Sequence, residues 1–476
     1  MLFNSFHFLF FFIIVTSLYF VLPYNRRWLL LLISSCYFYM AFVPIYILIL
    51  GFTIVIDYFA GKYIENAEGK KRKLFLIFSL VANIGVLAIF KYYNFLNHNF
   101  SFLMYGFGLT NPIPYLSILL PIGLSFHTFQ AMSYTIEVYR GRQKAERHFG
   151  IYSLYVMFYP QLVAGPIERP QNLLHQFREK YDFEYDRVVE GLKLMLWGLF
   201  KKLVIADRLA IYVNTVYNNS EQHNGKAFIL ATIFFAFQIY CDFSGYSDIA
   251  IGAAKVMGFK LMTNFNRPYL ARNISEFWKR WHISLSTWFK DYLYISLGGN
   301  RVSIPRWYFN LLLVFIISGL WHGANWTYII WGALNGFYLI FAIISQGFRN
   351  KINRLTGIEK LPHLNYLLQV LVTFMLSCFA WIFFRANNVT DALSIIKKIS
   401  TFGGSIFVEN PSMMIYSFFG IFLLLFVELK KEFYTGDFSF FSNSSWLVRN
   451  LSYAMLIILI LLVGVFDGGQ FIYFQF

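Results

Sequence analysis

The chain has 476 residues, of which 58% are hydrophobic and only 13% are charged. A soluble globular domain has about a quarter of its residues charged, so an ordinary soluble fold is excluded. The mean hydropathy of +0.53 is that of a polytopic membrane protein. The net charge of +16 would suggest a nucleic-acid partner in a soluble protein, but here the basic residues form short clusters between apolar runs. Because cytoplasmic loops of membrane proteins have this pattern, we expect no nucleic-acid binding.

The N-terminal stretch MLFNSFHFLFFFIIVTSLYF is predominantly apolar. No basic region precedes it and no small-residue cleavage site follows it, so we interpret it as a retained first span rather than a signal peptide. The positive-inside rule places the basic segments 23–27, 61–73 and 140–148 in the cytoplasm, and the N-terminus is then outside.

Apolar runs that could form spanning helices continue along the chain. A spanning helix needs ~20 mostly apolar residues. Candidate runs lie near residues 6–22, 28–43, 44–60, 74–90, 115–138, 150–165, 190–206, 228–250, 308–322, 324–345, 365–384, 413–429 and 449–466. Helix breakers at 121–123 and 163–166 predict irregular backbone, which persists at membrane depth only where protein buries it or where it lines a wet cavity. With no low-complexity linker, the sequence predicts one all-α membrane domain over residues 1–476 that encloses a cavity.

The segment RNISEFWKRWHISLSTWFKDYLYISLGGNR, residues 272–301, resembles neither a span nor a loop. Its Trp and Phe residues recur at helical spacing, opposite a polar face. That polar face consists of Lys279, His282, Ser286 and Lys290. Asn273 with Glu276 fits a capping box, and Gly298-Gly299 fits a helix end. The pattern predicts an amphipathic helix at the membrane interface, with packing against the bundle as the alternative.

A histidine stands inside the apolar stretch SGLWHGANWTYIIWGALNGFYL. An ionisable side chain in a span indicates function, and desolvation would keep His322 neutral and able to act as a general base. Asn325 would share its helical face and could orient the ring or hold an oxyanion. Gly323 would leave room for a substrate, and Gly332 with Gly336 would allow close helix approach. A structural, hydrogen-bonded histidine is the alternative.

Other polar residues in apolar surroundings have several possible roles. Asp242 and Asp248 could orient a histidine or pair with a lysine, and hydrogen bonding between helices is an equal alternative. His127 stands beside a Pro-Gly break, where packing or hydrogen bonding is the more typical role. The three cysteines have no motif spacing, so we expect neither a disulfide nor a metal site.

Several stretches together resemble the membrane-bound O-acyltransferase family, and within it the bacterial alginate O-acetylation branch. Besides the histidine stretch SGLWHGANWTYIIWGALNG, they are LPIGLSFHTFQAMSYTIEVYRG (120–141), FYPQLVAGPIERP (158–170), QIYCDFSGYSDIAIGAAKVMGF (238–259), NFNRPYLARNISEFWKRWHISLSTWFKDYLYISLGGNR (264–301) and AWIFFRA (380–386). The resemblance covers roughly residues 1–400 and the C-terminal tip. It implies a curved ring of roughly 11–13 transmembrane or re-entrant helices around a central tunnel.

The resemblance also implies an activity. Relatives move an acetyl group from cytoplasmic acetyl-coenzyme A across the bacterial cytoplasmic (inner) membrane for O-acetylation of an extracellular or cell-wall polysaccharide. The family's invariant histidine corresponds to His322 and its second histidine to His282. A separate extracytoplasmic partner with an SGNH/GDSL-like esterase fold usually completes the transfer. We therefore expect an O-acetyltransferase in contact with membrane lipid, with no metal.

Basic residues near the two histidines could form a mouth for the coenzyme. Its phosphates cannot enter hydrocarbon, so they would stay at a basic cytoplasmic face. The candidate contacts are Lys279, Arg280, Lys290, Arg301 and Arg306. For each of them, interfacial anchoring is an equal alternative. His322 would then deprotonate the acceptor hydroxyl as it attacks the thioester, while exclusion of water protects the thioester from hydrolysis.

The C-terminal tail, residues 467–476, ends in FIYFQF after a pair of glycines. By composition it is an aromatic interfacial anchor. It also resembles the terminal motif of the small peptide that accompanies the related teichoic-acid D-alanylation protein, which implies that Tyr473 is a covalent acyl shuttle. Two further functions stay open: D-alanyl transfer from a carrier protein to teichoic acid, and transport of a polymer or lipid precursor.

Overall fold

The computed structural model describes residues 1–117, 120–163, 165–434, 445–466 and 471–472. In this part of the chain all regular structure is helical and no β-strand occurs, which confirms the all-α class. Eight of the described helices are long and apolar enough to cross a membrane. They are Pro44–Asn66, Gly69–Gly106, Gly225–Val256, Ile304–His322, Trp326–Ile344, Pro362–Arg385, Pro411–Phe433 and Trp446–Val463. The protein is therefore a multi-pass membrane protein.

The chain separates into two compact units. The first comprises Met1–Met195 and Ile249–Met262, and the second comprises Leu196–Asp248 and Thr263–Phe476. Two helices, α10 (Tyr185–Leu199) and α12 (Gly225–Val256), contribute residues to both units. The expectation of one membrane domain over the whole chain stays a prediction.

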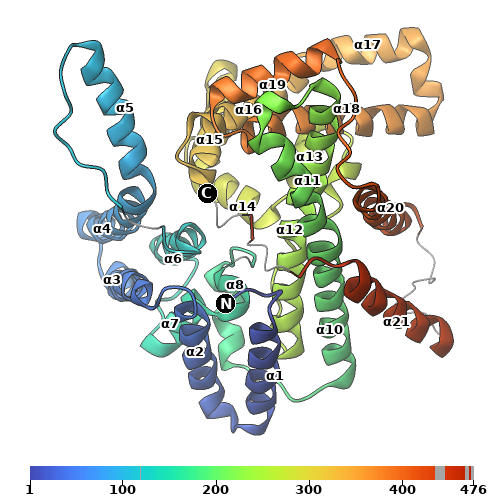
Figure 1. Ribbon diagram of the computed structural model, residues 1–476. Helices are drawn as coiled ribbons and strands as arrows, with labels where there is room; N and C mark the ends of the chain where they lie inside the picture. The colour runs from blue at the N-terminus through green and yellow to red at the C-terminus, as the bar shows by residue number, and fades with distance from the viewer. Residues whose placement is uncertain (118–119, 164, 435–444, 467–470, 473–476) are drawn as a thin grey trace. The chain divides into compact units, whose positions relative to one another are not determined.

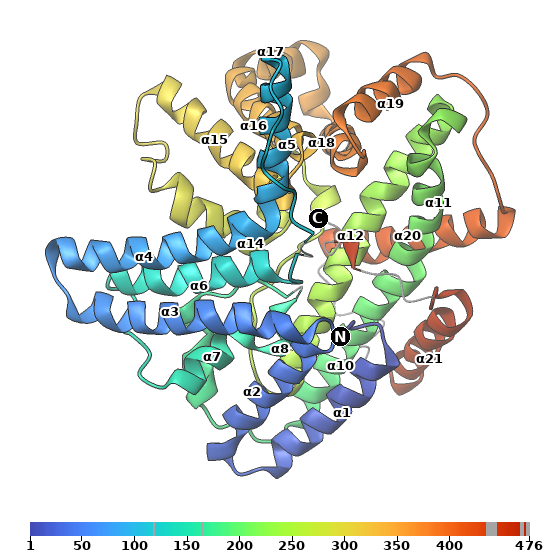
Figure 2. The same ribbon diagram turned by 60° about the vertical axis from the view of Figure 1, so that its left-hand side comes forward.

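The first unit is built mainly from the N-terminal helices, labelled in Figure 1. They are α1 (Phe6–Val21), α2 (Tyr24–Met40), α3 (Ile47–Asn66), α4 (Gly69–Leu87), α5 (Tyr93–Gly106), α6 (Leu124–Tyr139), α7 (Phe149–Met157), α8 (Tyr159–Leu162) and α9 (Pro170–Leu173). Figure 2 shows α3, α4 and α6 side by side. Between them, Asp57 accepts hydrogen bonds from Ser79 at 2.6 Å and Asn83 at 2.9 Å. His127 hydrogen-bonds to Thr53 at 2.6 Å, so it has the hydrogen-bonding role that its sequence context favoured.

The two expected helix breaks lie in the first unit. Gly123 has a left-handed backbone with φ of 76°, and α6 begins directly after it. A Cβ atom at Gly123 would lie 2.8 Å from the carbonyl oxygen of Leu162, so a side chain cannot fit there. Near the second break, α7 ends at Met157 and α8 continues for only four residues. The irregular backbone near Pro121 and before Pro166 is thereby confirmed.

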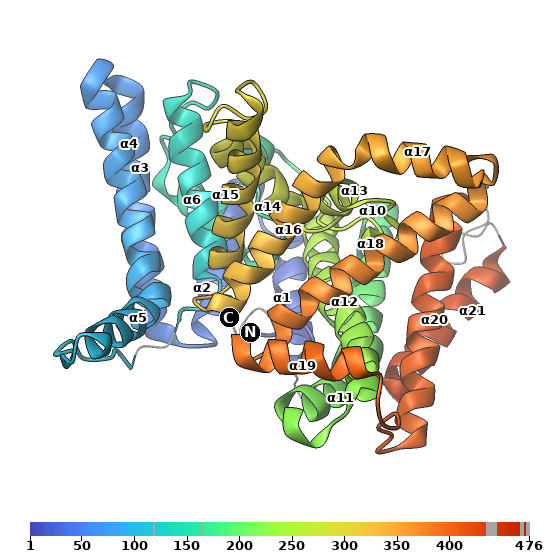
Figure 3. The ribbon, with the colours of Figure 1, turned by 90° about the horizontal axis from the view of Figure 1, so that it is seen from above.

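The second unit contains the remaining helices. They are α11 (Asp207–Asn218), α13 (Ile274–Arg280), α14 (Ile283–Trp288), α15 (Ile304–His322), α16 (Trp326–Ile344), α17 (Gln346–Thr356), α18 (Pro362–Arg385), α19 (Val389–Thr401), α20 (Pro411–Phe433) and α21 (Trp446–Val463). Figure 3 shows α16 between α15 and α18, and both pairs are in contact. This three-helix arrangement carries the histidine stretch.

Glycines set the distance between α15 and α16. A Cβ atom at Gly332 would lie 2.2 Å from the carbonyl oxygen of Phe315, and one at Gly319 would lie 2.2 Å from that of Tyr328. A Cβ at Gly336 would lie 3.2 Å from the Cα of Leu312. The two backbones therefore approach as closely as the Gly332–Gly336 pair predicted.

The amphipathic helix expected over 272–301 is broken, so the prediction of one continuous helix was wrong. The chain leaves the helical conformation at Trp281, and His282 has a left-handed backbone with φ of 42°. After α14, a π-helical turn spans Phe289–Tyr294. The cause lies earlier in the chain, because the backbone oxygen of Asn264 accepts a hydrogen bond from the Ile283 nitrogen at 2.9 Å and its side chain accepts one from Ser284.

The break separates the residues that would have shared one polar face. His282 is only 1% exposed, whereas Lys279 and Lys290 are exposed. The predicted helix signals at both ends are confirmed. The Asn273 side chain accepts a hydrogen bond from the Glu276 nitrogen at 2.9 Å, and Gly298 has a positive φ of 97° beyond the last turn.

The contact between α15 and α16 predicts the effect of a single methyl group. We expect Gly332→Ala to destabilise the protein by about 1–3 kcal/mol, because the methyl group would overlap a backbone carbonyl that cannot rotate away. Gly347→Ala in α17 is the matched control, since no atom lies within 4 Å of its added Cβ. The measurement is the thermal unfolding midpoint of each purified variant in detergent. Equal midpoints for the two variants would contradict the close packing.

Candidate active site

His322 is the last residue of α15, and the chain turns directly after it. Gly323 has an extended backbone, and α16 begins only at Trp326. The prediction that His322 and Asn325 share one helical face was therefore wrong. The Asn325 side chain instead caps α16, with its oxygen accepting from the Thr327 nitrogen at 3.1 Å and its nitrogen donating to the Asn387 carbonyl at 3.1 Å. Both ends of the amide are engaged, so its proposed contact with the ring or an oxyanion has no support in this geometry.

Aromatic rings surround the His322 side chain, which is only 3% exposed. Its ring centroid lies 5.0 Å from Trp321, 5.0 Å from Trp331 and 5.4 Å from Phe384. Trp321 comes from the same helix, Trp331 from α16 and Phe384 from the end of α18. Three helices thus build a cage that excludes water from the imidazole.

His282 lies in the same aromatic region and has a defined polar partner. Its Nδ1 lies 3.2 Å from the side-chain oxygen of Asn264. Because an amide oxygen only accepts hydrogen bonds, this contact assigns the proton to Nδ1 and leaves Nε2 as the basic nitrogen. Asn264 is itself held, since its nitrogen donates to Ser247 at 3.1 Å and its oxygen accepts from Ser284 at 2.9 Å. Burial lowers the pKa of the His282 ring to about 3, so the ring is neutral at physiological pH.

Trp321 lies against both predicted catalytic histidines. Its ring centroid is 6.3 Å from that of His282 and 5.0 Å from that of His322. The two histidines come from the start of α14 and the end of α15, and the break at Trp281 is what turns His282 inwards. The structure therefore brings the pair into one neighbourhood, although an interfacial helix with His282 on its polar face would not have done so.

A buried charged cluster lies elsewhere in the second unit. Lys202 forms ion pairs of 2.6 Å with Asp207 and with Asp242. Asp242 therefore takes the lysine-pairing alternative, and Asp248 does the same with Lys201 at 2.6 Å. Lys202 and Asp207 were not predicted as functional residues from the sequence. The signal was present, since two adjacent lysines interrupt the apolar run MLWGLFKKLVIA.

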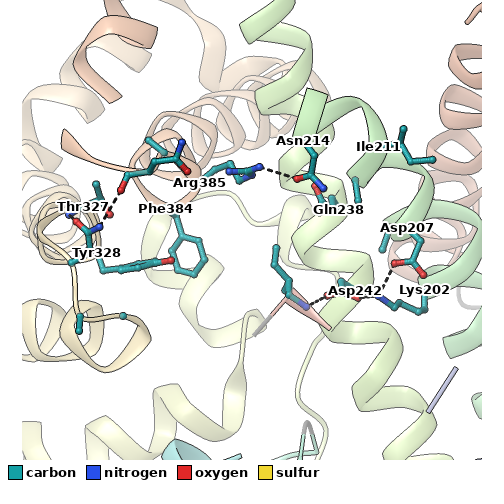
Figure 4. A pocket seen from close by; sticks show the side chains of 18 residues that line it. Lys202, Asp207, Ile211, Asn214, Gln238, Asp242, Thr327, Tyr328, Phe384 and Arg385 are labelled. Atoms are coloured by element: carbon teal, nitrogen blue, oxygen red, sulfur yellow. Dashed lines mark hydrogen bonds and ion pairs between the residues drawn. The ribbon is translucent and has the colours of Figure 1, made fainter. Parts of the chain in front are cut away.

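A pocket of about 560 Å³ lies beside this cluster (Figure 4). Its walls come from the region around α11, from α12, from the turn after His322, from the end of α18 and from the C-terminal segment. The lining residues are Lys202, Ala206, Asp207, Ala210, Ile211, Asn214, Gln238, Asp242, Gly323, Ala324, Asn325, Thr327, Tyr328, Phe384, Arg385, Ala386, Asn387 and Ile472. The pocket thus begins at the residue that follows His322.

Gly323 has a different role from the one expected. A Cβ atom there would lie 2.1 Å from the ring of Tyr328, so the missing side chain makes room for that ring rather than for a substrate beside His322. Tyr328 in turn packs against Phe384, with ring centroids 5.0 Å apart. Gly323, Tyr328 and Phe384 all line the pocket.

The basic residues expected at a coenzyme mouth fall into two groups. Arg280 donates to both carboxylate oxygens of Glu432, at 3.1 and 2.9 Å, and to Glu276 at 2.7 Å. This engagement removes Arg280 as a free phosphate contact. The others, Lys279, Lys290, Arg301 and Arg306, are exposed.

Tyr473 lies outside the described residues, but the two residues before it are placed. The Ile472 nitrogen donates to Asp242 at 2.6 Å, on the carboxylate that also pairs with Lys202. Phe471 is fully buried and stacks on Tyr246 with ring centroids 4.5 Å apart. Ile472 thus lies in the pocket wall, and Phe471 beside it is held by Tyr246.

Comparison with known proteins finds a matching family model and several similar proteins, all of them acyltransferases. The family model for MBOAT, the membrane-bound O-acyltransferase family, matches residues 140–387. The chain is 40% identical over 406 residues to the probable alginate O-acetylase AlgI of Pseudomonas aeruginosa. The aligned region covers 85% of this chain and 75% of that protein. It is 36% identical over 439 residues to the peptidoglycan O-acetyltransferase of Helicobacter pylori, with 85% and 80% covered.

A more distant relative is the teichoic acid D-alanyltransferase of Bacillus subtilis. It is 26% identical over 283 residues, which cover 56% of this chain and 69% of that protein. The family match spans more than half of the chain and includes both histidines of the aromatic cluster. The chain belongs to the membrane-bound O-acyltransferase family and is a multi-pass membrane O-acyltransferase.

Proposed function

We propose that this protein takes an acetyl group from cytoplasmic acetyl-coenzyme A and delivers it across the bacterial cytoplasmic membrane for O-acetylation of a cell-envelope polysaccharide. The observation that carries the proposal is the placement of His322, buried at the end of a spanning helix and followed directly by a pocket wall. Relatives named as an alginate O-acetylase and a peptidoglycan O-acetyltransferase support the acetyl group and the polysaccharide acceptor.

His322 is the proposed general base. The acceptor oxygen attacks the thioester carbonyl and loses its proton to the imidazole, while the carbon–sulfur bond breaks and the coenzyme leaves as a thiolate that is then protonated. The cage of Trp321, Trp331 and Phe384 supports this role, because a water-free site protects the thioester from hydrolysis. His282, with Nε2 as its basic nitrogen, is the second proposed catalytic residue.

The donor would approach from the opposite end of α15. That helix rises by roughly 27 Å from Ile304 to His322 at 1.5 Å per residue. Exposed Lys279, Lys290 and Arg301 are proposed to hold the coenzyme phosphates at the cytoplasmic face. The pantetheine arm alone then extends into the protein.

Tyr473 is proposed as an acyl shuttle between the coenzyme and the outside. Its phenol oxygen would form an ester with the acetyl carbon as the thioester bond breaks, and its proton would pass to His322. The fixed positions of Phe471 and Ile472 at the pocket support this proposal, since they anchor the chain immediately before the tyrosine. An extracytoplasmic partner with an esterase fold is the proposed recipient.

D-alanyl transfer is the second candidate, and the similarity to teichoic acid D-alanyltransferases favours it. The two reactions share the histidine chemistry and differ in the acyl donor. Incubation of the purified protein with acetyl-coenzyme A or with a D-alanyl carrier protein separates them.

Removal of the base is the first test. We expect His322→Ala to lower the rate of coenzyme A release from acetyl-coenzyme A by about 10²–10⁴-fold, the usual contribution of a general base. The control is His363→Ala, an exposed histidine at the start of α18 whose loss leaves the aromatic cage intact. The rate is measured with labelled acetyl-coenzyme A and purified protein. Undiminished release by His322→Ala would refute the catalytic assignment.

Removal of one oxygen atom tests the shuttle. We expect Tyr473→Phe to abolish acetylation of the polymer in cells and to eliminate an acetyl label on the protein, because phenylalanine cannot form the ester. Tyr434→Phe is the matched control, since Tyr434 is an exposed tyrosine at the end of α20. Polymer acetylation at the wild-type level in the Tyr473→Phe strain would exclude the shuttle and leave the role of His322 untouched.

A further inference from the structure

The helix α17 carries an exposed apolar face. None of its residues is buried. Phe348, Ile352 and Leu355 are 69%, 39% and 78% exposed. At about 100° per residue, these three side chains fall within one narrow stripe along the helix. The exposed stripe is therefore an unpartnered face of an amphipathic helix.

A second amphipathic helix of the same unit shows the usual arrangement. In α19 the apolar residues Ala392 and Ile395 are buried against the protein, and the charged Lys397 is exposed. Such burial supplies most of the free energy that stabilises a short helix. Because α17 lacks an equivalent burial against the protein, its apolar face requires another apolar environment.

Basic side chains flank the apolar stripe on both sides. Arg349 lies on one edge of it, and Lys351 and Arg354 lie on the other. The helix contains no acidic residue, and Lys360 follows it in the chain. Arg349 donates one hydrogen bond to the carbonyl oxygen of Ala342 at 2.6 Å, which ties α17 to the end of α16. Four basic residues on or beside an amphipathic helix are a pattern that recognises anionic lipid headgroups.

The neighbouring helices place α17 at the membrane surface. Both α16 and α18 are long and apolar enough to span the membrane. Figure 3 shows that α17 connects the end of α16 with the start of α18. A link between two spans lies at one face of the membrane, and the basic charge of α17 assigns this face to the cytoplasm. At that depth the apolar stripe enters the acyl-chain boundary while the cations stay among the headgroups.

We propose that α17 is a docking site for anionic phospholipid of the cytoplasmic leaflet. Phe348, Ile352 and Leu355 insert among the acyl chains, and Lys351 and Arg354 bind the phosphates. A protein partner is a poorer fit, because a stable interface uses roughly 20–30 residues on each side and this stripe has only three apolar ones. The proposal is independent of which acyl group the protein transfers and of the acceptor.

The first test titrates the purified full-length protein in detergent with phosphatidylglycerol, with phosphatidylcholine of the same acyl chains, and with glycerol phosphate. The unfolding midpoint gives an apparent Kd for each probe. We expect phosphatidylglycerol to raise the midpoint most and glycerol phosphate to leave it unchanged. The double variant Lys351→Gln, Arg354→Gln should bind phosphatidylglycerol more weakly, by about fivefold for each charge removed. Leu355→Ser should also weaken binding, whereas Lys397→Gln on α19 is the matched control and should bind like the wild type.

A photoactivatable phosphatidylglycerol locates the site on the wild-type protein, so this arm does not depend on the folding of any variant. Adducts are mapped by peptide mass spectrometry. We expect them on the peptide that contains residues 346–356. The unfolding midpoint of each variant without lipid controls for folding, and it should match the wild type because the substituted side chains are exposed.

The proposal is overturned if phosphatidylcholine or glycerol phosphate stabilises the protein as well as phosphatidylglycerol does, if the double variant binds phosphatidylglycerol like the wild type, or if no adduct forms on α17. A second copy of the chain as the occupant of the stripe would overturn it too. In that case Leu355→Ser would lower the mass of the purified particle and leave lipid binding unchanged.

Discussion

The close approach of α15 and α16 is the constraint on which the site depends. Because Gly319 and Gly332 bring one backbone against carbonyl oxygens of the other helix, the turn between the helices has little freedom. That turn ends α15 at His322 and starts α16 at the Asn325 cap, so both the imidazole and the pocket wall take their positions from it. A wider separation would let water enter between Trp321 and Trp331 and would remove the dry environment of the ring.

Ion pairs connect helices within the second unit. Lys201, Lys202 and Arg280 each meet at least one carboxylate, and such pairs hold helices together without needing a ligand. Arg385 instead donates to the amide oxygens of Asn214 and Asn218 and lies over the Tyr217 ring. Asn264 likewise holds its neighbours in place, since its side chain hydrogen-bonds to His282, Ser284 and Ser247.

Sequence patterns predicted the structural features that depend on residues close together along the chain. Eight of the thirteen apolar runs coincide with described helices that are long and apolar enough to span a membrane. Pro121 with Gly123 marked a break, and Gly332 with Gly336 indicated close packing. The failures have a common cause in contacts between distant segments. Nothing in residues 272–301 indicates that Ser284 hydrogen-bonds to Asn264 and that the helix breaks there. The i, i+3 spacing of His322 and Asn325 likewise does not reveal that the helix ends between them. Arg385 was not predicted, because its contacts with Asn214 and Asn218 in the pocket wall join segments that are distant in the sequence.

The left-handed backbone of His282 affects how this residue should be studied. A non-glycine residue in that conformation costs about 1–2 kcal/mol, and hydrogen bonds to Asn264 maintain it. Replacement by alanine would therefore remove the imidazole and keep the strain, mixing a chemical effect with a conformational one. Asparagine tolerates this backbone better than most residues, so His282→Asn isolates the chemistry of the ring. Kinetic data for this position are interpretable only against a substitution that matches the backbone as well as the side chain.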